Sequence, residues 1–147
     1  MNNNPYKPLK AYLAAPFEDR DEMLVLKAAL EARDVIVTST WLTPADGNES
    51  NMAALKDKFH ECRCRALKDI EDICESDVLI LRKPKDKHKV PTTGGHHVEV
   101  GICLGTGKPI VLYGHRENVF HYLPQVQVAE TFEDLCKVLH ISLEVNA

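Results

Sequence analysis

The chain has 147 residues, of which 44% are hydrophobic and 27% are charged, a balance typical of one globular domain with its own core. This composition excludes an intrinsically disordered chain and a collagen-like repeat. Eighteen Lys and Arg residues against 22 Asp and Glu residues give a formal net charge of −4 at pH 7. Because no net positive charge gathers phosphate backbones, we expect no nucleic acid partner.

The cysteines and the N-terminal residues bear on where the protein works. The five cysteines are odd in number and most lie in apolar helical or strand-like patterns, which indicates free thiols in a reducing compartment. Residues 1–5 (MNNNP) lack the apolar core of a signal peptide, and no apolar run approaches the ~20 residues of a membrane span. We therefore expect a soluble, cytoplasmic protein with no membrane partner.

The first part of the chain predicts a β-α-β unit. Residues 11–15 (AYLAA) form a short apolar run that stops at a proline, as a buried parallel strand does. Apolar residues recur with helical spacing over residues 19–33, where we expect Asp19 to cap the helix with Glu22 three positions later. The β-branched run at residues 35–38 predicts a second strand, parallel to the first.

Strands and helices alternate along the rest of the chain. The further expected elements are a loop at 40–51, one long or two short helices at 51–75, a strand at 78–81, a basic loop at 83–93, a short helix at 98–104 that Gly105 or Gly107 ends, strands at 109–113 and 126–128, and a last helix at 132–139. This alternation predicts an α/β fold: an open parallel sheet of about five strands with helices on both faces, Rossmann- or flavodoxin-like. We expect it to span residues 10–142, between tails at residues 1–9 and 143–147.

Ligands bind beyond the carboxyl ends of the strands in such sheets, where several polar residues are expected. The segment 92–95 (TTGG) leads into the helix that carries Glu99, and its glycines either let the backbone approach an anion or a hydroxyl or form a plain turn. Glu99 has apolar neighbours and is either a surface carboxylate or a partly desolvated nucleophile or base. Adjacent histidines such as His96 and His97 point apart, and no familiar ligand spacing completes a set with them, so we expect no metal site.

Other side chains also have structural alternatives. Tyr12 is either a core aromatic residue or a functional one, and Trp41 is often a cap over the edge of a core. Asp69 and Asp72 fall on the predicted helix before the third strand, where a solvated acidic face beside Lys68 is the simplest interpretation. None of these residues decides a function by itself.

Three motifs occur together in a specific order. They are residues 11–17 (AYLAAPF), Asp69 lying eight positions before Asp77, and residues 94–101 (GGHHVEVG) followed by 104–109 (LGTGKP). In this order they resemble the nucleoside 2-deoxyribosyltransferase family, including its relatives that hydrolyse nucleoside monophosphates. The resemblance runs from about Lys10 to Val128.

The resemblance implies a role for each of five residues. Glu99 would be the nucleophile that attacks the anomeric carbon and forms a covalent glycosyl-enzyme intermediate, as carboxylates do in retaining glycoside chemistry. Tyr12 would hydrogen-bond to Glu99 and orient it, and Asp69 would pass a proton to the leaving nucleobase. Phe17 and Trp41 would stack on that base.

The resemblance also implies contacts to the sugar, and here it leaves alternatives open. The transferases carry an aspartate and the monophosphate hydrolases a serine where this chain has Thr93. With Gly94, Gly95 and His96, Thr93 would hold either the sugar or a 5′-phosphate. Asn118 resembles the asparagine that many transferases contribute to a neighbouring subunit's site, and its alternative role is to cap a turn.

The sequence thus predicts an enzyme that cleaves the N-glycosidic bond of a 2′-deoxynucleoside and transfers the deoxyribosyl group to another nucleobase. Hydrolysis of a nucleoside 5′-monophosphate and non-catalytic sensing of a nucleotide are the alternatives, and the basic segment at 82–89 is either a solvated loop or a docking segment. The expected partners are a small-molecule nucleoside or nucleotide and a free nucleobase. We expect no cofactor, and a homodimer or higher homo-oligomer with shared active sites.

Overall fold

The computed structural model describes residues 7–43, 58–84 and 94–145, and it is built around a parallel sheet. The strands are β1 (Lys10–Ala14), β2 (Ile36–Val37), β3 (Val78–Lys83), β4 (Ile110–Gly114) and β5 (Val126–Ala129). Their order in the five-stranded sheet is β2-β1-β3-β4-β5, so the direction of winding reverses between β1 and β3. The predicted α/β architecture is confirmed, including its five parallel strands.

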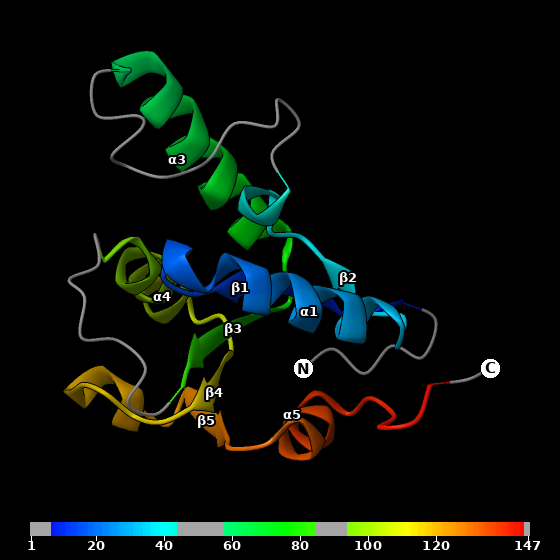
Figure 1. Ribbon diagram of the computed structural model, residues 1–147. Coiled ribbons are helices and arrows are strands. Elements are labelled where there is room, and N and C mark those ends of the chain that lie inside the picture. The colour runs from blue at the N-terminus through cyan, green and yellow to red at the C-terminus, as the bar shows by residue number, and fades with distance from the viewer. Residues whose placement is uncertain (1–6, 44–57, 85–93, 146–147) are drawn as a thin grey trace.

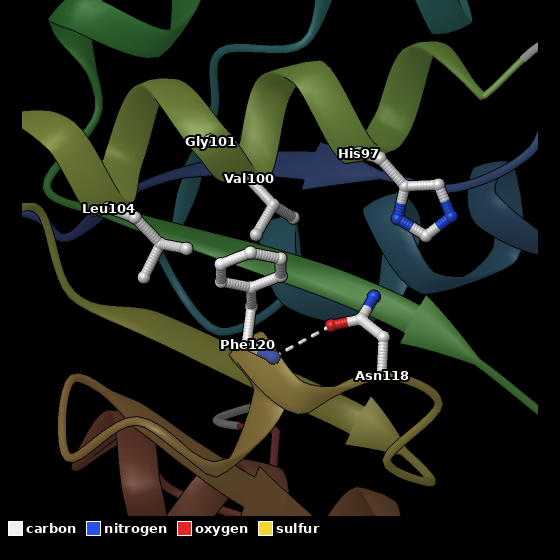
Figure 2. A pocket seen from close by; sticks show the side chains of 6 residues that line it. All are labelled: His97, Val100, Gly101, Leu104, Asn118 and Phe120. Atoms are coloured by element: carbon white, nitrogen blue, oxygen red, sulfur yellow. Dashed lines mark hydrogen bonds between the residues drawn. The ribbon is translucent and has the colours of Figure 1, made fainter.

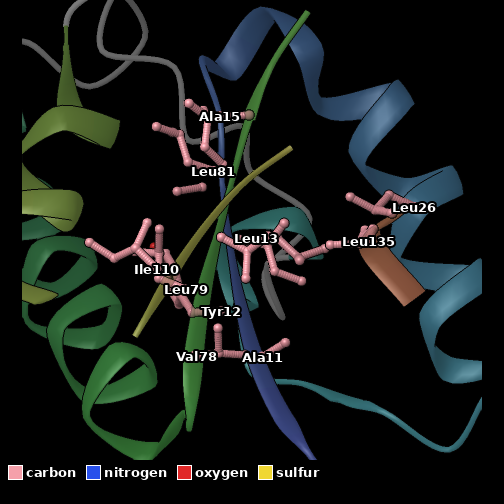
Figure 3. Packing of buried hydrophobic residues seen from close by; sticks show 14 of the residues in the cluster. Ala11, Tyr12, Leu13, Ala15, Leu26, Val78, Leu79, Leu81, Ile110 and Leu135 are labelled. Carbon is pink, nitrogen blue, oxygen red and sulfur yellow. The ribbon is translucent and has the colours of Figure 1, made fainter. Parts of the chain in front are cut away.

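Helices cover both faces of the sheet. The α-helices are α1 (Arg20–Glu31), α3 (Phe59–Glu75), α4 (Gly95–Thr106) and α5 (Phe132–Leu139), and the short 3-10 helices are η1 (Phe17–Asp19), η2 (Thr40–Leu42) and η3 (Val119–Tyr122). Figure 1 shows α3 extending away from the sheet. Viewed along the edge of the sheet in Figure 3, α3 and α4 lie on one side and α1 and α5 on the other.

The core lies on both faces of the three central strands. Its largest fully buried side chains include Tyr12, Leu13, Leu79, Leu81 and Ile110, which are labelled in Figure 3. Ile80 and Leu112 are fully buried as well. Parallel strands that are covered on both faces require apolar residues at successive positions, which explains the near-continuous apolar runs in the sequence. Tyr12 pairs with Leu79 in the register of β1 and β3, so both residues point to the same face of the sheet.

The ends of the helices test the expected caps. The capping box of α5 is complete, because the Thr131 side chain accepts from the Asp134 N–H and the Asp134 carboxylate accepts from the Thr131 N–H. Gly107 ends α4 with a left-handed φ of 75°. The expected side-chain cap by Asp19 is wrong: its backbone (φ −93°, ψ 10°) continues from η1 and lies outside the extended region that lets a capping side chain reach back.

Parts of the expected loops and of the long helix, at residues 44–57 and 85–93, lie outside the described residues. The described portion of the expected loop at 40–51 contains η2, in which Trp41 and Leu42 are buried. Among the described residues, no helix combines the length and the apolar character that a membrane crossing needs.

Candidate active site

A hydrogen bond joins β1 to α4 at the middle of the sheet. The Tyr12 hydroxyl donates to Oε1 of Glu99 over 2.9 Å, although the two residues are 87 positions apart in the sequence. Tyr12 is completely buried, and α4 packs against β1 and β3 so that Glu99 faces the sheet. The fold therefore holds one carboxyl group in a fixed direction against a phenol.

The surroundings of Glu99 favour its neutral form. Burial raises the pKa of the Glu99 carboxyl to about 8, and the nearby Asp69 charge adds to this, whereas the hydrogen bond from Tyr12 acts to lower that pKa. Burial and the Glu99 charge together raise the pKa of Tyr12, which keeps the phenol protonated as a donor. A half-buried carboxyl group with a fixed hydrogen-bond donor and a strongly raised pKa is typical of a functional site.

Asp69 adds a second carboxyl group from α3, the helix beside α4 on the same side of the sheet. Burial and then the charge of Asp72 raise the pKa of Asp69 to about 6, and Arg65 acts to lower it. Asp69 interacts electrostatically with both Tyr12 and Glu99. The structure thus brings together the three residues for which the sequence predicts catalytic roles, from β1, α3 and α4.

The Tyr12→Phe variant tests the contribution of the hydroxyl group. Because the hydrogen bond favours ionised Glu99, we expect its loss to raise the pKa of Glu99 further above 8, by about one to two, since a hydrogen bond to a charged group is worth about 1.5–3 kcal/mol. NMR titration of the glutamate side-chain carboxyl carbons measures this change. Tyr113→Phe is the matched control, because Tyr113 lies on the other face of the sheet and faces Arg82. An unchanged Glu99 titration in Tyr12→Phe contradicts the assignment.

The N-terminus of α4 carries the two predicted glycines. Gly94 occupies the N-cap position with a φ of 76°, a left-handed conformation that favours glycine, and its carbonyl accepts from the His97 N–H over 3.0 Å. Among the described residues, nothing lies within 4 Å of where a Cβ would stand at Gly95. The first amides of a helix have no partner within the helix itself. Thr93 lies outside the described residues.

His96 lies on the same side of α4 as Glu99, three positions earlier. It is 3% exposed, and burial together with the charges of His97 and Lys83 lowers the pKa of its imidazole to about 4, so the ring is neutral at pH 7. Within the described residues, its Nε2 has no hydrogen-bond partner. A buried neutral imidazole with an unused nitrogen is suited to accept from or donate to a bound ligand.

The expectation that His96 and His97 point apart is wrong. Their ring centroids lie 4.1 Å apart, because no preceding helical turn restricts the rotamers of residues in the first turn. Nε2 of His97 lies 3.7 Å from Oε1 of Glu117, whose carboxylate also pairs with Lys83. Among the described residues, no three His, Cys, Asp or Glu side chains are grouped so as to hold a metal ion.

The two aromatic residues predicted to stack on a base have different surroundings. Phe17 begins η1 directly after β1 and is half-buried against the core. Trp41 is 9% exposed, and its indole Nε1–H donates to the Leu13 carbonyl over 2.8 Å. Trp41 thus caps the edge of the core, and its contact with a base stays a prediction.

Asn118 lines a cavity on the far side of α4 from Glu99. The cavity has a volume of about 370 Å³, and its lining residues are His97, Val100, Gly101, Leu104, Asn118 and Phe120 (Figure 2). Oδ1 of Asn118 accepts from the Phe120 N–H over 3.0 Å and so caps η3. The capping alternative is therefore realised within the chain.

Sequence reasoning missed the buried surroundings of two polar residues. Asp72 does not belong to a solvated face, because it is 1% exposed and paired with Lys68 and Thr40. His121 is 1% exposed, and its Nδ1 accepts from the Glu117 N–H over 2.9 Å. Helical spacing places Asp72 near Asp69, but only the packing of η2 against α3 shows that it is buried.

Several solved structures are similar to this chain, and two of them are described below, whereas no family model and no curated protein matches it. The 2-deoxyribosyltransferase of the psychrotolerant bacterium Bacillus psychrosaccharolyticus has a TM-score of 0.66 and 21% identity, over 86% of this chain and 89% of that one. The CMP N-glycosidase of Clostridium botulinum has a TM-score of 0.53 and 21% identity, over 89% of this chain and 98% of that one. This chain has the fold of these two enzymes.

The two enzymes are of the kinds that the sequence motifs resemble. One is named as a deoxyribosyltransferase and the other as an N-glycosidase, and both share the α/β fold over most of their length. At 21% identity the likeness establishes the fold of this chain. What the site does is therefore argued from its own residues.

Proposed function

We propose that this protein cleaves the N-glycosidic bond of a nucleoside or nucleotide, with Glu99 as the nucleophile. The observation that carries the proposal is the Tyr12–Glu99 hydrogen bond of 2.9 Å, with Asp69 in electrostatic reach of both residues. A similar fold in a deoxyribosyltransferase and a CMP N-glycosidase supports it. The favoured reaction is transfer of a 2-deoxyribosyl group from one nucleobase to another.

The proposed reaction has two displacements. In the first, a carboxylate oxygen of Glu99 bonds to C1′, the C1′–N bond breaks with its electron pair going to the base, and Asp69 gives a proton to the base. In the second, a nitrogen of an incoming base attacks C1′, the bond from C1′ to Glu99 breaks with its electron pair going to the released carboxylate, and the proton of that nitrogen returns to Asp69. Tyr12 donates to the ionised carboxyl group before attack and after release, when negative charge is present there.

Hydrolysis is the second candidate reaction, with water in place of the incoming base. It is supported by the two glycines, Gly94 and Gly95, at the N-terminus of α4 and by buried His96, whose Nε2 has no partner among the described residues, because such groups suit a 5′-phosphate. The substrate would then be a nucleoside 5′-monophosphate, and the products a free base and a sugar phosphate.

Chromatography of reaction mixtures tests the proposal. The protein is incubated with each 2′-deoxynucleoside and each nucleoside or deoxynucleoside 5′-monophosphate, with and without a second free base. A new nucleoside that forms only with the added base supports transfer, and free base with sugar or sugar phosphate supports hydrolysis. If every substrate survives while a nucleotide binds, the enzymatic proposal is wrong and the protein is a sensor.

We further propose that a second copy of the chain covers the surface formed by α4 and η3. The exposed apolar side chains are Val98 on α4 and Val119, Phe120, Tyr122 and Leu123 in or directly after η3. Phe120 also lines the cavity of Figure 2. Such a concentration of exposed apolar side chains is typical of an interface, and it supports a homo-oligomer in which Asn118 lies close to the partner's site.

The Phe120→Glu variant tests this interface. Phe120 is 58% exposed, so the fold tolerates the charge, whereas a carboxylate buried between two copies is strongly unfavourable. We expect wild type to sediment as a dimer or larger assembly and Phe120→Glu as a monomer. Val25→Glu is the control, because Val25 is 71% exposed on α1, and it leaves the assembly intact. A monomeric wild type at all concentrations contradicts the proposal.

A further inference from the structure

Asp72 lies three positions after Asp69 on α3, and the sequence motifs assign it no role. We propose that Asp72 is a positioning residue that fixes α3 against the sheet and, through its negative charge, keeps Asp69 able to donate a proton. This inference rests on the proposed function of Asp69 as the acid that protonates the leaving base.

The carboxylate of Asp72 is buried and makes several polar contacts. It is 1% exposed, and its Oδ2 accepts from the Thr40 N–H over 2.9 Å and from the Thr40 hydroxyl over 2.5 Å. Its Oδ1 lies 3.1 Å from Nζ of Lys68, which is exposed to solvent on the same helix. These contacts join the last turns of α3 to η2.

The segment that Asp72 holds is itself bonded to β1 beside Tyr12. The Ser39 hydroxyl oxygen accepts from the Leu13 N–H, and the Trp41 indole donates to the Leu13 carbonyl. Both backbone groups of Leu13 are therefore bonded by residues on either side of Thr40. Through this chain of contacts, Asp72 ties the helix that carries Asp69 to the strand that carries Tyr12.

The charge of Asp72 acts directly on Asp69. Among the described residues, Asp69 interacts electrostatically with Asp72 and Arg65 on its own helix, with Tyr12 on β1 and with Glu99 on α4, and Lys68 offsets the charge of Asp72 through their ion pair. Burial is the largest cause of its raised pKa of about 6, Asp72 is the next, and Arg65 opposes both. Without the negative charge of Asp72, a smaller fraction of Asp69 is protonated at pH 7.

This coupling matters because the proposed reaction needs Asp69 protonated while Glu99 is ionised. The pKa is about 6 for Asp69 and about 8 for Glu99, so when the two residues share one proton, that proton is mostly on Glu99. The active form, with the proton on Asp69, is therefore the less populated one. Each interaction that brings the two pKa values closer increases the fraction of molecules with Asp69 protonated and Glu99 ionised. Asp72 raises that of Asp69, and Tyr12 lowers that of Glu99.

The Asp72→Asn variant separates charge from packing, because asparagine keeps the size and one oxygen that accepts from Thr40. We expect the pKa of Asp69 to fall below 6, as measured by NMR titration of the aspartate carboxyl carbons. We expect the acidic limb of the kcat profile to move to lower pH, and kcat at pH 7 to fall about three- to tenfold with little change in KM. Cleavage of 7-methyl-2′-deoxyguanosine, whose cationic base leaves without a proton, is expected to change less than twofold.

Two further variants keep the inference testable if Asp72→Asn does not fold. Lys68→Met removes the cation beside Asp72, and because Lys68 is exposed the fold is retained; the pKa of Asp69 and the acidic limb then move to higher pH. Thr40→Val removes one hydrogen bond but no charge, so stability falls while the Asp69 titration stays in place. A purely structural role for Asp72 predicts the same Asp69 titration in all three variants and wild type, and that outcome overturns the inference.

The titration also distinguishes the two proposals. If wild type cleaves no nucleoside or nucleotide, the proposed function is wrong, whatever Asp69 does. If wild type is active but Asp72→Asn leaves the titration and the pH profile unchanged, the function stands and the role of Asp72 is wrong. Asp69→Asn gives the rate that remains when the acid itself is removed.

Discussion

The Glu99→Gln variant is expected to abolish turnover, with a fall in kcat of about 10⁴-fold or more, because an amide cannot form the glycosyl ester. The glutamine oxygen still accepts from the Tyr12 hydroxyl, so the geometry of β1 and α4 is retained. The measurement is the rate of base release, by chromatography, for the best natural substrate. Full activity in this variant contradicts the assignment of Glu99 as the nucleophile.

The same variant is expected to be more stable than wild type at alkaline pH. The pKa of Glu99 is raised to about 8 in the folded protein. At pH values below the ordinary glutamate pKa, the carboxyl group is therefore neutral in both the folded and unfolded states. As pH rises from the ordinary glutamate pKa of 4.5 to about 8, the unfolded chain ionises while Glu99 in the folded protein stays protonated, so wild type loses stability over this range and the loss levels off above pH 8. Glutamine carries no such cost, and we expect an advantage of about 2 kcal/mol at pH 9 that disappears at pH 4.

Thermal unfolding across this pH range measures the effect. A change of about 2 kcal/mol shifts the melting temperature by several degrees in a domain of this size. Glu144→Gln is the matched control, because Glu144 is exposed near the C-terminus and its neutralisation leaves the pH dependence as in wild type. Equal pH dependence in Glu99→Gln and wild type contradicts the burial of an ionisable Glu99.

The sheet and most helices could be predicted because local patterns and packing agree. The last helix was expected at 132–139 and observed there, since its apolar positions and its Thr131–Asp134 capping box lie within a few residues of each other. The β-branched and apolar runs gave β1, β3 and β4 because both of their faces are covered. Asp19 failed as a cap because η1 changes its backbone before α1 begins.

The site was less predictable, because its contacts span distant parts of the chain. Spacing alone does not connect Tyr12 with Glu99, and only the family resemblance paired them before the structure showed their hydrogen bond. Asp72 and its neighbour Lys68 look like a solvated helix face in the sequence. Its burial depends on how η2 packs against α3, and no local pattern encodes that packing.

The Gly114→Ala variant is expected to be strongly destabilised, more so than the other variants described above. Gly114 ends β4 with a φ of 134°, which residues with a side chain rarely adopt, and a Cβ there would lie 1.9 Å from the Lys83 carbonyl oxygen. Because the obstacle is backbone rather than a movable side chain, β3 and β4 must separate at this end. We expect a loss of about 3 kcal/mol or more in the free energy of unfolding, measured with chemical denaturant.

Gly105→Ala is the matched control for this variant. Gly105 lies within α4, and no described residue comes within 4 Å of a Cβ there, so alanine is expected to stabilise the helix by about 0.5–1 kcal/mol. Equal stability of Gly114→Ala and wild type contradicts the close approach at Lys83. This approach also matters for the site, because Lys83 pairs with Glu117 and its carbonyl accepts from the His115 N–H. The glycine thus lets the chain turn back over β3 and brings Glu117 to His97, beside the N-terminus of the helix that carries Glu99.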